Sequence, residues 1–591
     1  MTKNLIVILF ILALKNSFSQ ETFFRINQLG YPVTETKKAL LISKNVFEEK
    51  ISLCKASDGT EVANCKVNPD PSTPWPPFNY YYEIDFSDFK TEGEYFLCTG
   101  QGDVKSQHFK IGNYPSYQKE ILHFMRSQRC GYNPEIKQVC HTHDGLTFFG
   151  PVPDSSYLDA SGGWHDAGDQ LKYLITSSNA TARLLLAYEW CPDKFADEVN
   201  SLGQPFPNQI PDVLDEAKWG LDWIHKLHPA PGQLYHQVAD DRDHRGFKMP
   251  DNDNSDYGWG KNSYRPVYFA TGKPQGAGKY KSEATGVSNI AGRSAAAMTI
   301  AYRIWKNILK DKVYADKCLQ AALDLYQMGK KQEGYQQGNS YGEPYRYYED
   351  TWADDMEWAA AELYKVTRNQ QYLKDAIRFA KIINTASWME MDSASHYQMY
   401  PFINIGHYAL WEIGDAATKK MVSEYYRHNL EKIKARALKN PYQVGHIFIW
   451  CSNNLAAAVI TQVILYEKMT GDRQFHFLLN THLDWLLGRN PWGTSMITGI
   501  PENGDYPLDV HMPFWVLKKK SISGSLVDGP LWETIHGKML GIKLNEPDEY
   551  DKFQPPHLKY WDDYADYSTN EPTMDGSADI LFFMAFFSGH K

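Results

Sequence analysis

The sequence has few of the features that mark membrane, nucleic-acid-binding or disulfide-framework proteins. It contains no block of basic residues, and its net charge is −10, so nucleic acid is not an expected partner. Its one conspicuous apolar run, Leu5 to Leu14, is too short to span a bilayer. Eight cysteines in 591 residues are too sparse for a disulfide framework. Apolar residues nevertheless make up 43% of the chain, which is enough for a sizeable core.

The N-terminus has the pattern of a secretory signal. Lys3 supplies a positive start, the apolar run follows, and small residues at Ser17 and Ser19 precede Gln20. We therefore expect a signal peptide over residues 1–19 and an exported protein, either periplasmic or secreted.

The cysteines are predicted to play separate roles in different parts of the chain. Cys54, Cys65 and Cys98 fall in the first hundred residues, where one pair could form a disulfide, although the sequence does not say which. Three others, Cys191, Cys318 and Cys451, lie singly in apolar segments and are expected to be buried thiols.

Residues 20–112 read as a small β domain. Short runs of aromatic and branched residues alternate with Gly, Pro, Asn and Asp clusters, which is typical of strands joined by turns. The runs are Arg25–Tyr31, Lys38–Ile42, Tyr80–Asp85 and Glu94–Cys98. About ninety residues of this kind predict a β-sandwich.

Residues 113–591 read as mainly α, with strand signals nearly absent. Apolar residues recur every three or four positions in about a dozen stretches. These are 117–125, 171–188, 213–224, 290–308, 318–328, 356–366, 372–383, 403–413, 421–433, 455–466, 475–487 and 577–587. Twelve helices fit six helical hairpins closed into an (α/α)6 barrel. An α-solenoid is the alternative, but no fixed repeat period supports it.

The stretch Ser161-Gly-Gly-Trp-His-Asp-Ala-Gly-Asp169 is the strongest candidate for a catalytic site. Asp166 and Asp169 lie three residues apart with only Ala167 and Gly168 between them. Two carboxylates on one turn can hold a water molecule between them, as a general base requires. The alternative is that they stabilise the start of a helix.

A metal site is predicted in the loop that leads into this stretch. Cys130, Cys140, His141 and His165 supply two thiolates and two imidazoles, a complete tetrahedral set for a structural zinc ion. His143 is a rival fourth ligand, and a Cys130–Cys140 disulfide is the alternative to a metal. The acidic loop 251–256 is a possible calcium site, with a solvated turn as the alternative.

These residues resemble glycoside hydrolase family 9, the inverting cellulases and related β-glycosidases. SGGWHDAGD followed by Lys172 and Tyr173 looks like the family signature, and RINQLGY near residue 25 resembles its N-terminal immunoglobulin-like module. At least seven motifs follow in the family's order. They include Leu214-Asp-Glu with Lys218-Trp-Gly220, Asp243-His244, Asp354–Ala360, Gly488–Ser495, Ser525–Pro530 and Asp566–Glu571.

The resemblance implies roles for individual residues. Glu571 matches the family's general acid, Asp169 its general base, and Asp166 the residue that helps to hold the water. The cysteine and histidine set matches a structural zinc site found in members that carry the module. Substrate contacts are expected from Trp164, Asp243, His244, Trp450, Arg489, His511 and Tyr567.

One segment departs from the family pattern. Cellulases of the family usually carry a Pro-His-His-Arg-type segment, whereas this chain reads Pro507-Leu-Asp-Val-His-Met-Pro513. His511 matches one histidine and the arginine is missing. Asp509 could instead favour a cationic amino-sugar, or it could face solvent while Lys518 or Arg489 supplies the missing contact.

The expected function is an inverting hydrolase of β-linked glucan-type polysaccharides or oligosaccharides, similar to an endoglucanase. An exo-acting β-glucosidase or β-glucosaminidase is the alternative within the same chemistry. Two alternatives from other classes are a non-catalytic glycan-binding protein and a polysaccharide lyase. The lyase would need a tyrosine or histidine base, and its product would absorb in the ultraviolet.

Overall fold

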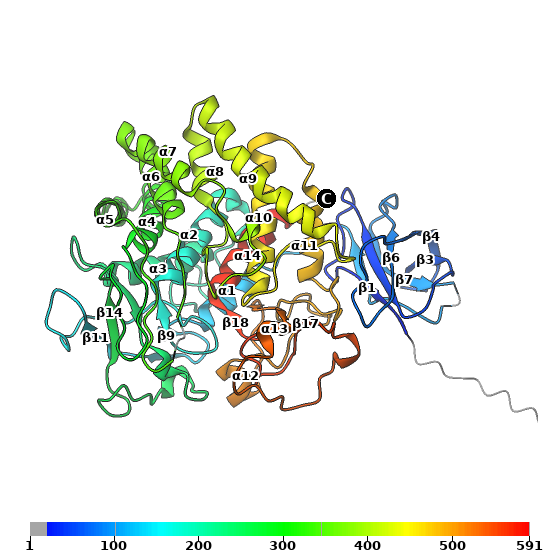
Figure 1. Cartoon of the computed structure of the whole chain (residues 1–591), viewed down its shortest axis with the longest axis horizontal. Helices are drawn as coiled ribbons and strands as arrows, with labels where there is room; N and C mark the ends of the chain where they lie inside the picture. Colours follow the sequence, from blue (N-terminus) through cyan, green and yellow to red (C-terminus); the bar gives the residue numbers. More distant parts are fainter. Residues whose placement is uncertain (1–20, 101, 344–345, 590–591) are drawn as a thin grey trace, which may run out of the picture.

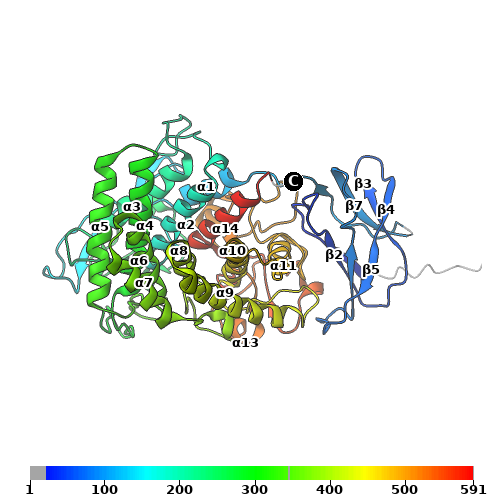
Figure 2. The same cartoon turned by 90° about the horizontal axis from the view of Figure 1, so that it is seen from above.

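A computed structural model describes residues 21–100, 102–343 and 346–589. The predicted signal peptide, residues 1–19, lies outside these ranges. Within them the chain forms a β-sandwich followed by a helical barrel, and Figures 1 and 2 show the sandwich beside the barrel in both views. No helix in the described ranges is both long enough and apolar enough to cross a membrane.

The sandwich consists of two four-stranded antiparallel sheets, with the orders β1-β2-β6-β5 and β4-β3-β7-β8. Its strands are β1 (Thr22–Arg25), β2 (Lys38–Ser43), β3 (Ile51–Lys55), β4 (Glu61–Asn64), β5 (Lys66–Pro69), β6 (Tyr80–Asp85), β7 (Gly93–Thr99) and β8 (Phe109–Ile111). Side chains such as Leu41, Leu53 and Leu97 are fully buried between the sheets. All eight cysteines are free thiols, so no disulfide joins Cys54, Cys65 and Cys98.

The helices pair into a closed ring of hairpins. The longer helices are α1 (Gln118–Ser127), α2 (Leu174–Trp190), α3 (Asp212–Leu227), α4 (Ser288–Asn307), α5 (Lys312–Lys331), α6 (Ala353–Thr367), α7 (Gln370–Ile383), α8 (Ile405–Ile413), α9 (Ala416–Ala437), α10 (Ser452–Thr470), α11 (His476–Leu486) and α14 (Met574–Phe587). Helices α2, α4, α6, α8, α10 and α14 pack against one another in that order, and α14 returns to α2. The predicted (α/α)6 barrel is therefore confirmed.

Burial explains which helices form the inner ring. Inner helices such as α2 and α14 are buried on nearly every side, because they contact neighbours all round. Outer helices such as α7 bury only one stripe, which includes Tyr372, Phe379 and Ile383. A helix that is apolar on all faces lies inside a core, whereas an amphipathic helix packs its apolar face against a core and leaves the other face in solvent.

The expectation of almost no strands after residue 113 was wrong. Ten short strands lie there: β9 (Gly131–Asn133), β10 (Gln138–Cys140), β11 (Asp144–Phe148), β12 (Lys172–Tyr173), β13 (Tyr235–Val238), β14 (Arg265–Phe269), β15 (Leu526–Val527), β16 (Leu531–Trp532), β17 (Leu558–Lys559) and β18 (Pro572–Thr573). Runs of two to five residues are too short to show the alternation that marks a strand. Two short helices, α12 (Pro513–Lys518) and α13 (Glu533–His536), were also not predicted.

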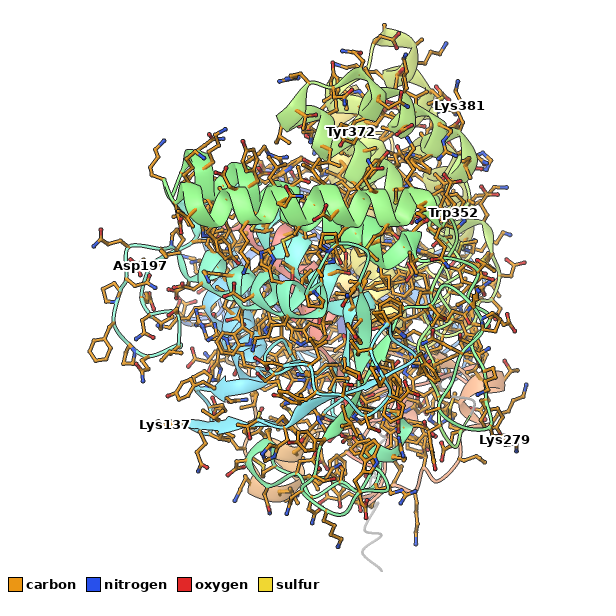
Figure 3. All side chains as sticks on the ribbon, turned by 90° about the vertical axis from the view of Figure 1, so that its left-hand side faces the viewer. Lys137, Asp197, Lys279, Trp352, Tyr372 and Lys381 are labelled. Carbon is orange, nitrogen blue, oxygen red and sulfur yellow. The ribbon has the colours of Figure 1, made fainter. Side chains whose placement is uncertain are left out.

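These short elements gather at one end of the barrel. Figure 1 shows β9, β11, β14, β18, α12 and α13 below the long helices. Figure 3 shows the same separation from the side, with Lys137 and Lys279 at the opposite end of the molecule from Tyr372 and Lys381 of α7. Strands β11, β14, β13 and β12 form one sheet at this end, and β15 pairs with β18. The barrel thus carries the candidate catalytic segments together on its loop-rich end.

Candidate active site

Three distant segments meet at a cavity of about 720 Å³ on the loop-rich end of the barrel. Asp169 reaches it from the loop before β12, His244 from the loop after β13, and Glu571 from the residue before β18. The structure therefore brings two of the three predicted catalytic acids to one cavity, although about 400 residues separate them in the chain.

The loop that carries Asp169 packs tightly against the opposite wall. The backbone N–H of Gly168 donates a 2.9 Å hydrogen bond to Oε1 of Glu571. A Cβ at position 168 would lie 2.0 Å from the carbonyl oxygen of His511, so only glycine permits this approach. The glycine between the two aspartates is what allows Asp169 and Glu571 to share one cavity.

The contacts of Asp169 favour its ionised form. Its Oδ1 accepts a 2.7 Å hydrogen bond from the N–H of Leu171, and its Oδ2 lies 3.1 Å from Nε2 of His244. Burial opposes ionisation, but the hydrogen bond and charge of His244 outweigh it and hold the pKa of Asp169 below its usual range. A carboxylate kept ionised beside a cavity suits a general base.

The surroundings of Glu571 favour its protonated form. Burial, followed by the charges of Asp528 and Asp169, raises the pKa of Glu571 well above the usual range of a carboxyl group. The backbone N–H of Asp528 also donates a 2.9 Å hydrogen bond to the carbonyl oxygen of Glu571. Two carboxyl groups whose surroundings push their pKa values in opposite directions are the arrangement expected of an acid and a base.

Asp166, the third predicted catalytic acid, is 4% exposed and is not among the residues that line the cavity. Its carboxylate accepts hydrogen bonds from the hydroxyls of Thr176 and Tyr347. Burial and the charge of Asp575 raise the pKa of Asp166 well above its usual range. Both hydroxyl partners were missed from the sequence, and only the tyrosine-rich stretch 341–348 could have pointed to Tyr347.

Five of the seven predicted substrate-binding residues line the cavity: Asp243, His244, Trp450, His511 and Tyr567. Trp450 and Tyr567 place their rings 5.8 Å apart, and the indole N–H of Trp450 donates a 2.9 Å hydrogen bond to Asp528. The cavity therefore has a fixed aromatic wall beside the acid. Lys248, Phe247, Glu343 and the segment Lys538–Leu540 also line it and were not predicted.

The other two predicted substrate contacts lie away from the cavity. Trp164 is fully buried and donates a 2.7 Å hydrogen bond to Glu216, so it supports the loop from behind. Arg489 is 1% exposed and donates to the carbonyl oxygen of Tyr442. Neither side chain can reach a sugar in the cavity, because protein atoms enclose both.

The roles predicted for residues of segment 507–513 also need correction. His511 faces the active-site cavity, but Val510 and Met512 are buried. Asp509 lines a different cavity, where it accepts a hydrogen bond from the indole of Trp515. An amino-sugar preference set by Asp509 in the active site therefore has no structural support, and neither Lys518 nor Arg489 lines that cavity.

The predicted metal ligands form one cluster. One ligand atom from each of Cys130, Cys140, His141 and His165 lies within 4.8 Å of all the others, and this is the only such group found among the described residues. His143 is not part of it, and its ring instead lies 5.4 Å from that of Tyr264, tilted by 57°. Both cysteines are free thiols, so the alternative disulfide is not formed.

The surroundings of the cluster fit a closed zinc site. Nε2 of His141 lies 3.1 Å from Oδ2 of Asp253, and a carboxylate behind a histidine ligand is the usual outer contact. The ammonium of Lys172 lies 3.2 Å from Sγ of Cys130, where it favours the thiolate. Two sulfur and two nitrogen donors match the composition of structural zinc sites.

The acidic loop 251–256 uses its carboxylates in other ways. Asp253 contacts His141, Lys248 and Ser255, and Asp256 accepts from the backbone N–H groups of Gly258 and Gly260. These contacts leave the loop closer to a solvated turn than to a calcium cage, and the calcium site stays a prediction.

Comparisons with known proteins find related families for both domains. The sequence model of glycosyl hydrolase family 9 matches residues 114–584, and that of the cellulase N-terminal ig-like domain matches residues 19–103. Endoglucanase D of Acetivibrio thermocellus is 26% identical, over 97% of this chain and 85% of the relative. Endoglucanase 19 of Arabidopsis thaliana is 25% identical, over 79% of this chain and 73% of the relative.

Solved structures share the whole architecture. A metagenome-derived glycoside hydrolase family 9 endoglucanase has a TM-score of 0.75 at 25% identity, covering 96% of this chain and 99% of that one. A Zn-binding triple mutant of the family 9 endoglucanase J30 has a TM-score of 0.73 at 24% identity, covering 95% and 100%. Both domains and their order are therefore shared with known proteins.

Proposed function

The chain belongs to glycosyl hydrolase family 9, and on that premise we propose that it is an inverting, endo-acting β-glucanase with Glu571 as its general acid and Asp169 as its general base. The observation that carries the assignment is that Glu571 and Asp169 line one cavity, where the N–H of Gly168, next to Asp169, donates a hydrogen bond to Glu571. The surroundings support it, because they raise the pKa of Glu571 and lower that of Asp169.

The reaction proceeds by direct displacement at the anomeric carbon. Glu571 donates its proton to the oxygen of the leaving sugar as the glycosidic bond breaks. Asp169 takes a proton from a water molecule that attacks the opposite face of the sugar ring, so the configuration inverts. This geometry requires room for the water, and the two carboxyl groups should lie roughly 6.5–9.5 Å apart.

Asp166 acts through position and hydrogen bonding. Its backbone carbonyl oxygen accepts a 3.0 Å hydrogen bond from the N–H of Met574, the third residue after Glu571. We propose that Asp166 ties the loop of the base to the start of α14 and thereby positions Asp169, rather than holding the attacking water itself. The aromatic pair Trp450 and Tyr567 forms the wall on which the sugar chain lies.

We further propose that Cys130, Cys140, His141 and His165 hold a structural zinc ion. When bound, zinc supplies no chemistry to hydrolysis, because four protein ligands leave no open position. Its effect is mechanical, since His165 directly precedes Asp166 and fixes the start of the catalytic loop. Export from the cytoplasm is proposed from the signal pattern over residues 1–19.

A substrate panel tests the proposed function. Purified protein is assayed on soluble β-glucan, xyloglucan, cello-oligosaccharides and chitosan oligomers, and the products are sized. We expect a rapid fall in chain length of the polymers, as internal cleavage produces. Release of single sugars from chain ends would favour the exo-acting alternative, and no hydrolysis of any β-glycan would reject the proposal.

A further inference from the structure

A second cavity lies where the β-sandwich meets the barrel. It has a volume of about 1070 Å³ and is larger than the active-site cavity. We call it the junction cavity. Its walls come from β1 and from segments 504–519, 544–553 and 561–564 of the barrel. Its size is at the upper end of the range of roughly 300–1,000 Å³ that is common for small-molecule sites.

Aromatic side chains with fixed orientations stand in its walls. The indole N–H of Trp515 donates to the carboxylate of Asp509, and that of Trp561 donates a 3.0 Å hydrogen bond to Asp548. Both indoles are partly exposed. A ring held at its polar edge keeps its orientation before a ligand arrives, which lowers the cost of binding. Flat apolar faces of this kind suit the C–H faces of a pyranose ring.

The ammonium group of Lys519 lies over the ring of Trp515 and is easily displaced. The ammonium of Lys519 lies 5.2 Å from the ring of Trp515 and 5.3 Å from that of Tyr564. Lys519 is exposed, and such contacts at exposed sites are weak. A sugar ring can therefore replace the ammonium on Trp515 at little cost.

Acidic side chains outnumber basic ones in the cavity wall. Carboxyl groups of Asp505, Asp509, Asp548 and Asp562 line it together with three further acids, whereas the basic side chains are Arg25, Lys105, Lys519 and Lys552. Carboxyl groups accept hydrogen bonds from hydroxyls, and their excess disfavours anionic ligands such as uronates and phosphates. Among the described residues they form no group close enough to hold a metal ion.

Arg25 fixes one wall of the cavity from behind. It is 6% exposed and uses Nε and Nη1 on the carbonyl oxygens of Pro491 and Phe24. Its guanidinium lies 4.3 Å from the ring of Phe553, which also lines the cavity. These contacts hold β1 and the barrel segments of the wall in place.

The junction cavity shares a wall with the active site. Asp509 and Trp515 line the junction cavity, whereas His511 and Pro513, in the same segment, line the active-site cavity. A sugar chain bound in one cavity therefore lies next to the segment that shapes the other.

From these observations we infer that the junction cavity is an accessory binding site for a neutral β-glucan chain, held by Trp515, Trp561 and the carboxyl groups between them. The inference rests on the proposed function for the class of sugar, but it assigns a site that catalysis does not use.

The test is calorimetric titration of the Asp169→Asn protein with cellohexaose. We expect two binding sites. Adding Trp515→Ala should abolish or weaken one of them by at least about tenfold, while Trp450→Ala should weaken the other. Trp259→Ala is the matched control, because this 40% exposed indole lines neither cavity, and both sites should remain.

Hydrogen exchange gives a readout that needs no substitution in the cavity. Cellohexaose should slow exchange in residues 544–564 of Asp169→Asn. A single binding site, with no protection of 544–564, would overturn the inference. If the wild-type protein hydrolyses cellohexaose in the same preparation, that result leaves the proposed function intact. If it neither hydrolyses nor binds the sugar, the proposed function fails as well.

Discussion

Glu571 and Asp169 should respond differently to neutralisation. Glu571→Gln removes the proton donor, so hydrolysis of substrates with poor leaving groups should fall by about 10²–10⁴-fold, the usual contribution of general acid catalysis. Aryl glycosides with activated leaving groups need little protonation and should lose much less. Asp169→Asn should abolish both activities, because both need an activated water. Steady-state kinetics on the two substrate types make the comparison, and equal mild losses in both variants would contradict the assignment.

The pH dependence of activity tests the proposed protonation states of Asp169 and Glu571, and Asp528 offers a way to change one of them. Activity should fall as pH drops below the lowered pKa of Asp169, which must be ionised, and as pH rises above the raised pKa of Glu571, which must be protonated. After burial, the charge of Asp528 is the largest cause that raises the pKa of Glu571, and burial raises the pKa of Asp528 itself, so the two carboxyl groups compete for protons. Asp528→Asn should therefore move the alkaline limb of the kcat/KM profile to lower pH.

The asparagine at position 528 can still accept the hydrogen bond from Trp450, so the aromatic wall should stay in place. Asp375→Asn is the matched control, since Asp375 is a buried carboxylate on α7 that pairs with Lys330. The alkaline limb of the kcat/KM profile of Asp375→Asn should not move. An unchanged alkaline limb in Asp528→Asn would show that Asp528 does not set the protonation of the acid.

At the scale of single elements, the hairpin β9–β10 and the catalytic loop are joined through the proposed zinc ligands. The backbone N–H of Cys130 donates a 2.9 Å hydrogen bond to Gly163, and that of His165 a 2.7 Å bond to Gln128. Removing the metal should loosen residues 161–169. We expect about one equivalent of zinc by elemental analysis and faster hydrogen exchange in this loop for His165→Ala.

His143→Ala is the control for this prediction. His143 is an exposed histidine two residues after the ligand His141, and it is not in the cluster. It should retain both the zinc and the slow exchange. Less than about half an equivalent of zinc in protein prepared without added metal would reject the site.

The segment before α12 should set substrate preference. Only His511 of residues 509–512 faces the active-site cavity, and none of the described residues that line it is an arginine, which could bind sugar hydroxyls in a planar fork. We expect crystalline cellulose to be a poor substrate, with soluble, decorated or short β-glycans better. Values of kcat/KM across such a panel at one pH decide the matter, and highest activity on crystalline cellulose would show that this segment does not control specificity.

At the scale of the whole molecule, buried polar contacts join the sandwich to the barrel. Nδ2 of Asn27 donates a 2.9 Å hydrogen bond to Asp484, and the backbone N–H of Gln28 donates to Leu487. Asn27→Ala leaves a buried carboxyl group short of a partner, which typically costs about 1–3 kcal/mol. Its Tm should fall. Asn480→Ala, which removes an exposed bond to Thr36 across the same junction, should change Tm little.

The sequence predicted the long-range organisation better than the local detail. Long stretches with apolar residues every three or four positions, such as 372–383, identify helices reliably, and the spacing of Asp166 and Asp169 marks the proposed catalytic loop. The strand β18 beside Glu571 has only two residues, so no pattern could reveal it. Trp164 and Arg489 were misplaced because a sequence motif does not say which side of a loop a side chain occupies.

The sequence also could not reveal contacts between residues that lie far apart in the chain. Tyr347 reaches Asp166 from about 180 residues away, and Asp528 reaches Glu571 only because β15 pairs with β18. The helical pattern could not reveal the junction cavity either, because the cavity forms only when the sandwich docks on the barrel.

The central claim is inversion by Glu571 and Asp169, and proton NMR of the first products tests it most directly. Soluble β-glucan is hydrolysed in the spectrometer, and the anomeric proton of the new reducing end is followed before mutarotation. The account predicts that the α-anomer appears first and the β-anomer grows in later. Initial release of the β-anomer would contradict it, because that outcome requires a covalent intermediate and two displacements.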